Sequence, residues 1–216
     1  MNPGHLDTPG PAQTPAAPTS LHEARLEAAL ARLTQGGARR IADLGCGRGA
    51  LLDRLPGPTA VTEAVAVDLD AATLEAIRTR FEAGDRIRVE TVQGSVMDGR
   101  LKLGLLDCIV LLEVIEHIDP EDLSKLELAL FRAWRPRQVL ITTPNAEAND
   151  WLGVPRGRRR HWDHRFEWGR ERFQRWATGL AARSGYRVEF EAIGWDHPAC
   201  GAPTQMAVFT AGPSGS

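Results

Sequence analysis

Short apolar runs alternate with segments of helical period along most of this chain, and this alternation limits the folds open to it. We expect strands at 40–45, 64–67, 87–93, 106–112 and 138–142, and helices at 22–33, from 50 onward, and at 71–81, 120–134 and 170–184. Strands that alternate with helices form a parallel sheet with helices on both faces. Two final runs, 188–193 and 205–210, have no helix between them. The sequence therefore predicts an α/β fold with an open, mostly parallel sheet and an antiparallel hairpin at its edge.

One domain accounts for this pattern. With 216 residues, 43% of them hydrophobic, the chain can bury one good-sized core, which we place in residues 20–210. Residues 1–19 and 211–216 lack an apolar period, and we expect both tails to be disordered. No apolar run approaches the roughly 18 residues of a membrane helix, and no secretory signal is visible, which predicts a soluble cytoplasmic protein. The chain has three cysteines, Cys46, Cys108 and Cys200. Their odd number and wide spacing argue against a disulfide framework and against a zinc ribbon.

A glycine-rich turn follows the first predicted strand. Gly45, Gly47 and Gly49 stand where this strand passes to a helix, and glycine lets the backbone approach a ligand closely at the helix N-terminus. Their spacing is G-x-G-x-G, which differs from the G-x-G-x-x-G that suits a dinucleotide pyrophosphate. Asp68 ends the second predicted strand, where a carboxylate can accept both hydroxyls of a ribose. These features favour a nucleoside-containing cofactor and disfavour a nicotinamide enzyme.

This arrangement resembles the class I, Rossmann-like methyltransferases, which use S-adenosylmethionine. The resemblance implies that Asp43 and the glycines hold the methionine end of the cofactor and that Asp68 holds its ribose. The Gly94-Ser95 turn after the third strand then lies by the adenine. Cys46 belongs to the same loop, and we interpret it as a small spacer because no basic neighbour is visible to lower its pKa.

A group of carboxylate and imidazole side chains follows the fourth predicted strand. If the chain turns helical at Glu113, then Glu113, Glu116 and His117 share one helix face at the carboxyl end of a central strand. His161 and His164 stand in a polar, basic stretch further on. Mixed oxygen and nitrogen ligands without a nearby thiolate favour Mg²⁺ or Mn²⁺. We therefore predict a divalent metal site.

The formal net charge of −2 means that contact with a nucleic acid must rest on a local basic patch. One such run contains four arginines within five positions: Arg156, Arg158, Arg159 and Arg160.

Three motifs together resemble the small-RNA 3′-terminal ribose 2′-O-methyltransferases, the HEN family. They are Glu-Val-Ile-Glu-His at 113–117, Thr-Thr-Pro-Asn at 142–145 and Asp-His-Arg-Phe-Glu-Trp at 163–168. The resemblance extends over about residues 20–210, and includes Leu-His-Glu-Ala-Arg-Leu from 21 and Gly-Ala-Pro-Thr-Gln-Met-Ala-Val-Phe from 201.

The resemblance implies a methyl transfer from S-adenosylmethionine to the 2′-hydroxyl at the 3′ end of an RNA with free 2′- and 3′-hydroxyls. The implied metal ligands and catalytic residues are Glu113, Glu116, His117 and His164, with His164 preferred to His161 because of its place in the third motif. The ion would hold both hydroxyl oxygens of the terminal ribose and orient the 2′ oxygen for in-line transfer. Whether His117 or solvent accepts the proton stays open. RNA contacts are expected from the arginine run and from Asn145, and we expect a monomer.

Two features depart from the family pattern. Ala148 stands where relatives tend to have an aromatic residue, so a stacking contact near the substrate is absent or supplied elsewhere. Bacterial relatives often have a large additional N-terminal region, whereas this sequence has a short segment before the domain, which leaves partnership with an RNA-repair kinase or ligase open.

Two other functions remain as alternatives. A catechol-type O-methyltransferase would also need a metal and two vicinal hydroxyls, but its site would be enclosed and apolar. A non-catalytic RNA 3′-end binder would need neither the glycine turn nor the metal ligands.

Overall fold

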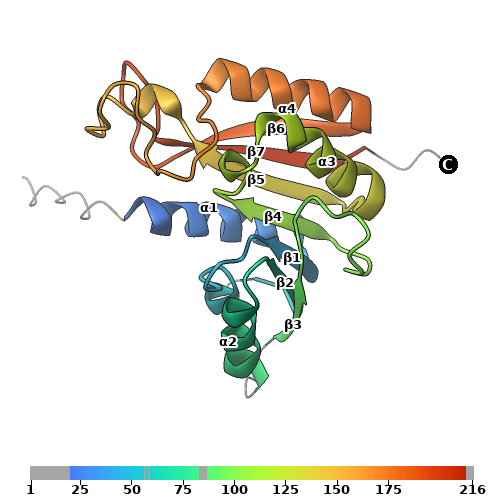
Figure 1. Ribbon diagram of the computed structural model, residues 1–216. Coiled ribbons are helices and arrows are strands. Elements are labelled where there is room, and N and C mark those ends of the chain that lie inside the picture. Colours follow the sequence, from blue (N-terminus) through green and yellow to red (C-terminus); the bar gives the residue numbers. More distant parts are fainter. Residues whose placement is uncertain (1–19, 56, 58, 83–86, 213–216) are drawn as a thin grey trace, which may run out of the picture.

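A seven-stranded sheet forms the centre of the computed structural model, which describes residues 20–55, 57, 59–82 and 87–212 (Figure 1). Its strand order is β3-β2-β1-β4-β5-β7-β6. The first five strands are parallel, whereas β7 is antiparallel to both β5 and β6. The strands are β1 Arg40–Leu44, β2 Glu63–Asp68, β3 Arg88–Gln93, β4 Cys108–Leu112, β5 Gln138–Pro144, β6 Tyr186–Ile193 and β7 Thr204–Ala211.

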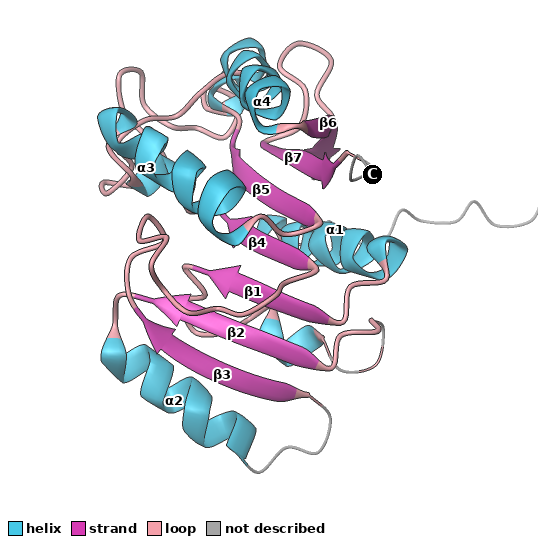
Figure 2. Cartoon of the chain, turned by 90° about the vertical axis from the view of Figure 1, so that its right-hand side faces the viewer, coloured by secondary structure: helices cyan, strands magenta, loops and turns pink. Residues whose placement is uncertain are grey.

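Helices cover both faces of this sheet (Figure 2). Successive residues of a strand point to opposite faces, so each strand contributes to two cores. Ala42 of β1 belongs to the core under α3 (Leu123–Leu128) and α4 (Arg170–Ser184). Its neighbour Ile41 belongs to the core under α1 (Leu21–Gly36) and α2 (Ala71–Glu82). None of the helices among the described residues is both long enough and apolar enough to cross a membrane.

The predicted strands and the antiparallel edge hairpin are confirmed to within two residues at each end. The segment expected to be helical at 120–134 is also confirmed, as a 3₁₀ turn at Pro120–Asp122, then α3, then a π-helical turn at Ala129–Trp134. The helix expected from residue 50 is wrong, because only a 3₁₀ turn forms at Leu52–Arg54. Pro56 and Pro58 follow directly, and proline stops a helix.

The ends of the predicted domain need one change. Residues 1–19 and 213–216, which we expected to be disordered, lie outside the described residues. Ala211 was placed in the C-terminal tail, but it ends β7, where its N–H donates to the Arg137 carbonyl at 2.9 Å. The sheet therefore extends one residue past the predicted boundary.

Candidate active site

The glycine-rich turn lies at the carboxyl end of β1. Gly45, Gly47 and Gly49 have φ values of +71°, +49° and +78°, which glycine adopts without strain. The Gly45 and Cys46 N–H groups donate to the Val67 carbonyl at 2.8 and 3.1 Å, which ties the turn to β2. A Cβ atom at Gly45 would lie 2.8 Å from Val114 Cγ2, too close for any side chain. The turn therefore needs glycine both for its backbone conformation and for its contact with the segment after β4.

Two carboxylates flank the turn. Asp43 is 3% exposed, and its Oδ2 has no hydrogen-bond partner among the described residues. Burial, and then the nearby charge of Asp68, raise the pKa of Asp43 to about 7. Asp68 ends β2 and is half-buried, with Oδ2 accepting from the Gly47 N–H at 2.9 Å and Oδ1 accepting from the Asp70 N–H at 3.0 Å. A cofactor with an amino group and a ribose fits this pair, because Asp43 lacks a donor and Asp68 stands at the strand end.

The Gly94-Ser95 turn completes this side of the site. Gly94 donates its N–H to the Asp68 carbonyl at 3.0 Å, so the end of β3 is fixed beside the end of β2. Cys46 is buried, and burial raises its thiol pKa, which favours the neutral thiol and a spacer role. All three cysteines are free and buried, as expected for small apolar residues.

The segment after β4 differs from the sequence-based prediction. Glu113 has a φ of +58°, a left-handed conformation that is strained for a residue with a side chain. Helical geometry begins only at the 3₁₀ turn Ile115–His117, so the expected alignment of Glu113, Glu116 and His117 on one helix face is wrong. The Glu113 N–H donates to the Thr142 hydroxyl at 3.0 Å, which holds the backbone away from helical geometry.

The carboxylates of Glu113 and Glu116 nevertheless both have partners inside the protein. Glu113 Oε2 lies 2.8 Å from the Arg25 guanidinium, and its Oε1 accepts from Thr142 at 2.9 Å. Glu116 is fully buried; its Oε2 accepts from Thr143 at 3.0 Å, while its Oε1 has no partner among the described residues. Burial, and then the neighbouring Glu113, raise the pKa of Glu116 well above its usual value. Glu116 therefore has an unpartnered carboxylate oxygen in a buried position, which a bound cation would stabilise.

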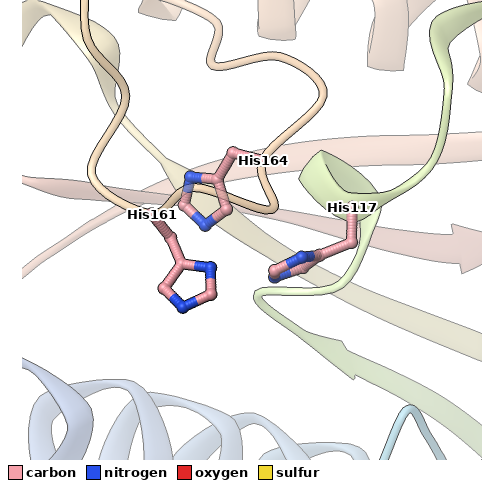
Figure 3. Close-up of side chains that lie close together, drawn as sticks. All are labelled: His117, His161 and His164. Carbon is pink, nitrogen blue, oxygen red and sulfur yellow. The ribbon is translucent and has the colours of Figure 1, made fainter.

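Three histidines from two segments of the chain converge. His117 comes from the turn after β4, and His161 and His164 come from the loop between β5 and α4 (Figure 3). One ring nitrogen of each lies within 4.8 Å of a ring nitrogen of the other two. Within the described part of the chain, this group of potential ligand atoms includes neither glutamate. The structure thus brings together the predicted His117 and His164, and adds His161, which the family resemblance left out of the ligand set.

Carboxylates behind the rings distinguish the histidines. Asp163 Oδ2 lies 3.1 Å from His117 Nδ1, and Glu167 Oε1 lies 2.5 Å from His164 Nδ1. A carboxylate on one ring nitrogen leaves the other nitrogen as a lone-pair donor, which is the usual arrangement behind metal-binding histidines. His164 is 8% exposed and burial lowers its pKa, which favours the neutral ring. Asp163 and Glu167 were not assigned roles from sequence, although the Asp-His-x-Phe-Glu motif contains both.

The arginine run divides into two parts. Arg160 is half-buried, and its guanidinium donates to Asn149 Oδ1 at 2.7 Å and to the carbonyls of Pro203 and Asn145. Asn145 is fully buried, with its side-chain N–H groups donating to the Cys200 and Ala202 carbonyls at 2.9 Å. Both residues therefore hold the loop in place, and the structure does not present them to RNA as we had predicted.

The remaining arginines lie on the surface. Arg158 and Arg159 are exposed, and neither side chain has a hydrogen bond or ion pair within the described ranges. Arg156 lies 3.9 Å from the exposed Asp150 carboxylate. Ala148, where relatives tend to have an aromatic residue, is fully buried.

A family model described as a methyltransferase domain matches residues 41–137. Together with the strand order and the glycine turn between β1 and Asp68, this match defines a Rossmann-like S-adenosylmethionine-dependent methyltransferase domain.

Relatives identify the family within this class. The chain is 35% identical over 186 residues to a small RNA 2′-O-methyltransferase of Mus musculus, and 30% identical over 210 residues to that of Arabidopsis thaliana. These matches cover 80% and 88% of this chain but only 46% and 22% of the relatives. The solved methyltransferase domain of bacterial CtHen1 is 37% identical, with a TM-score of 0.78, over 90% of this chain and 100% of that one. The chain belongs to the Hen1 family of small RNA 2′-O-methyltransferases.

Proposed function

We propose that this chain transfers the methyl group of S-adenosylmethionine to the 2′-hydroxyl of the 3′-terminal nucleotide of an RNA, and that the transfer requires a divalent metal ion. The observation that carries the proposal is the convergence of His117, His161 and His164, together with the buried, unpartnered Oε1 of Glu116, the residue directly before His117 in the chain. This group is next to the cofactor side of the site, because Val114 lies against Gly45 of the glycine turn.

The metal would be held by Glu113, Glu116, His117 and His164. The donor set fits a hard or borderline ion such as Mg²⁺ or Mn²⁺, since it combines carboxylate oxygens with imidazole nitrogens. When bound, such an ion supplies Lewis acidity to the two vicinal oxygens of a terminal ribose. His161 is exposed, and no carboxylate of the described residues is bonded to its ring, so it stays outside the proposed ligand set despite its proximity.

The chain's own residues account for positioning. Asp43 and the glycine turn hold the methionine end of the cofactor, Asp68 its ribose, and Gly94-Ser95 its adenine. Asp163 and Glu167 fix the rings of His117 and His164, so that the acceptor hydroxyl meets a preorganised site. The acceptor RNA needs free 2′- and 3′-hydroxyls, because both oxygens are used to orient the reaction.

The proposal is tested by transfer of labelled methyl groups to short RNAs. We expect methylation of an RNA with a 3′-terminal diol, loss with a 3′-deoxy or 3′-phosphate end, and loss in chelator that Mn²⁺ or Mg²⁺ reverses. Small vicinal diols should be poor acceptors. Robust methylation of the 3′-deoxy RNA, or full activity in excess chelator, would contradict the proposal.

Variants separate chemistry from folding. Alanine at any of the four proposed ligands should abolish transfer while S-adenosylhomocysteine still binds. His161→Ala should be milder. His22→Ala is the matched control, because His22 is exposed on α1, and it should leave transfer unchanged.

A further inference from the structure

We propose that Trp162 is a stacking platform for the base of the RNA's terminal nucleotide, and that Arg158 and Arg159 hold the phosphates that precede it. The inference rests on the proposed function, because it takes the terminal ribose to lie at the three histidines.

Trp162 stands at the tip of a turn that is fixed by the active site. His164 donates its N–H to the His161 carbonyl at 3.3 Å, which makes Trp162 and Asp163 the two central residues of the turn. The rings of His161 and His164 converge with His117 (Figure 3), and the Asp163 carboxylate is bonded to His117. The turn therefore has little freedom, and the position of its tip is determined by the same contacts that assemble the histidines.

The indole at this tip is open to solvent. Trp162 is 87% exposed, and its ring lies 5.4 Å from the His161 ring, centroid to centroid. Turn tips usually carry glycine, proline, asparagine, aspartate or serine, which have conformational reasons to be there. By comparison, Trp151 and Trp195 are about half as exposed, and they pack against each other with centroids 5.6 Å apart. Within the described residues, His161 is the ring that contacts Trp162, and the high exposure of Trp162 leaves the rest of its indole available to a ligand.

Free positive charge lies on the same loop. Arg158 and Arg159 are within four residues of Trp162 in sequence, and their guanidinium groups are exposed and unpaired in the described part of the chain. Arg160 and Glu167 anchor the loop beneath them, since Glu167 Oε1 accepts from the Arg160 N–H at 2.7 Å. Cationic side chains beside an exposed aromatic ring form the usual surface for single-stranded nucleic acid, whereas protein interfaces are centred on larger apolar patches.

The terminal ribose determines which group meets which side chain. A 3′-terminal ribose bears only its base and its 5′ phosphate besides the two hydroxyls. With the hydroxyls directed to the histidines, the indole next to His161 suits the base, and the arginines suit the phosphates. Stacking accepts any base, because every base has a π-face. The terminal base must then be unpaired, and its identity should matter little.

The test uses Trp162→Phe, which keeps an aromatic ring, and Trp162→Leu, which keeps apolar bulk without one. The affinity of wild type and of each variant is measured, with S-adenosylhomocysteine present, for two RNAs. One has a normal terminal nucleotide, and the other has a terminal ribose that lacks a base. We expect Trp162→Leu to lose about tenfold in affinity for the normal RNA and Trp162→Phe to lose less than about threefold. Wild type should bind the abasic RNA about tenfold more weakly than the normal RNA. Trp162→Leu should bind the abasic RNA with the same affinity as wild type.

The two proposals fail in different ways. If wild type methylates both RNAs but the three proteins bind them equally, Trp162 contacts no base and the inference is wrong, while the proposed function stands. The inference is also wrong if Trp162→Leu weakens normal and abasic RNA to the same extent, or if Trp162→Phe is as weak as Trp162→Leu. A wild-type protein that neither binds nor methylates any RNA would overturn both. Unchanged melting temperatures of the variants show that folding is not the cause.

Discussion

Asp43 is a residue of the candidate site that lowers the stability of the folded protein. In the folded protein its pKa is raised from 3.8 to about 7 because the carboxyl group is buried. Between these two pH values the unfolded chain releases a proton that the folded chain retains. Stability therefore falls as pH rises through this window, and the ionised form gains a partner only when a donor such as an amino group binds.

Replacing Asp43 by Asn should make the protein more stable and less able to bind its cofactor. At pH 8 we expect the free energy of unfolding to rise by about 1–3 kcal/mol, with the gain shrinking as pH falls from about 7 to 3.8 and disappearing below it, where Asp43 is protonated in both states. S-adenosylhomocysteine affinity should fall at least about tenfold, since a charge-assisted hydrogen bond is lost. Thermal denaturation across pH and calorimetry measure both effects. A destabilised variant that binds normally would show that Asp43 is a structural residue.

Glu167 acts through His164 and should affect metal binding without touching the ion. Glu167→Gln keeps the shape of the side chain but weakens the charge-assisted contact with His164 Nδ1. We expect Mn²⁺ affinity to fall about 10–100-fold, the usual effect of removing such a partner. Electron paramagnetic resonance of free Mn²⁺ measures this directly, without an activity assay. Glu171→Gln on the exposed side of α4 is the control, and equal Mn²⁺ affinity of the two variants would contradict the positioning role.

Residue types indicated the chemistry of the site but not the burial of each group. Arginine and asparagine in a basic loop are typical of RNA contacts, so nothing in the sequence distinguished Arg160 and Asn145 from the exposed Arg158. The distinction arises from carbonyl groups of Pro203 and Cys200, which reach the loop from the segment just before β7. Such long-range hydrogen bonds have no local sequence signature.

At the scale of elements, the loop between β5 and α4 has an anchored part and a free part. The Arg160 side chain binds Asn149 and two backbone carbonyls, whereas the side chains of Arg158 and Arg159 have no hydrogen bond or ion pair within the described residues. Substitutions in the anchored part should therefore lower the stability of the protein, whereas substitutions in the free part should weaken RNA binding.

Arg160→Ala should lower stability by about 1–3 kcal/mol, because buried carbonyl oxygens lose their donors. The double variant Arg158→Ala/Arg159→Ala should melt like wild type, bind RNA more weakly and show a salt dependence flatter by up to about two charges. Arg187→Ala, at the opposite end of the sheet on β6, is the control for charge removal. An unaltered salt slope in the double variant would mean that the two arginines do not meet the phosphates.

The strands were predicted more accurately than the connections. β1, β2, β4 and β5 are largely apolar because both faces of a parallel sheet are buried, and such runs are visible in sequence, whereas β3 at the sheet edge alternates apolar and polar residues. The turns after β1 and β4 were missed because proline at 56 and the hydrogen bond from Glu113 to Thr142 override local helical preference. These two turns form the centre of the site, where local rules are most often broken for function.

At the scale of the whole molecule, the site joins segments from the start, middle and end of the chain. Arg25 of α1 binds Glu113 after β4 at 2.8 Å, and its Nε donates to the Thr204 hydroxyl at the start of β7 at 3.1 Å. Both charged side chains are largely buried, at 16% and 18% exposure.

Arg25→Ala leaves Glu113 as an unpaired buried carboxylate and should destabilise the protein by about 2–4 kcal/mol. Arg32→Ala, on the same helix, removes ion pairs to the more exposed Glu189 and Glu191 and should cost less than about 1 kcal/mol. Urea denaturation of the two variants makes the comparison. Added Mn²⁺ should recover part of the loss in Arg25→Ala, and equal destabilisation in both variants would argue against a special role for this pair.

The left-handed backbone at Glu113 has a consequence for anyone who redesigns this enzyme. Glycine or asparagine would relax that conformation, just as an amide would relieve the buried carboxyl at Asp43. An automated search for thermostability would rank these positions among the first to change, and each accepted change would remove a group on which methyl transfer is proposed to depend. Such a search on this scaffold should hold both carboxylates fixed and optimise the helices on the two faces instead.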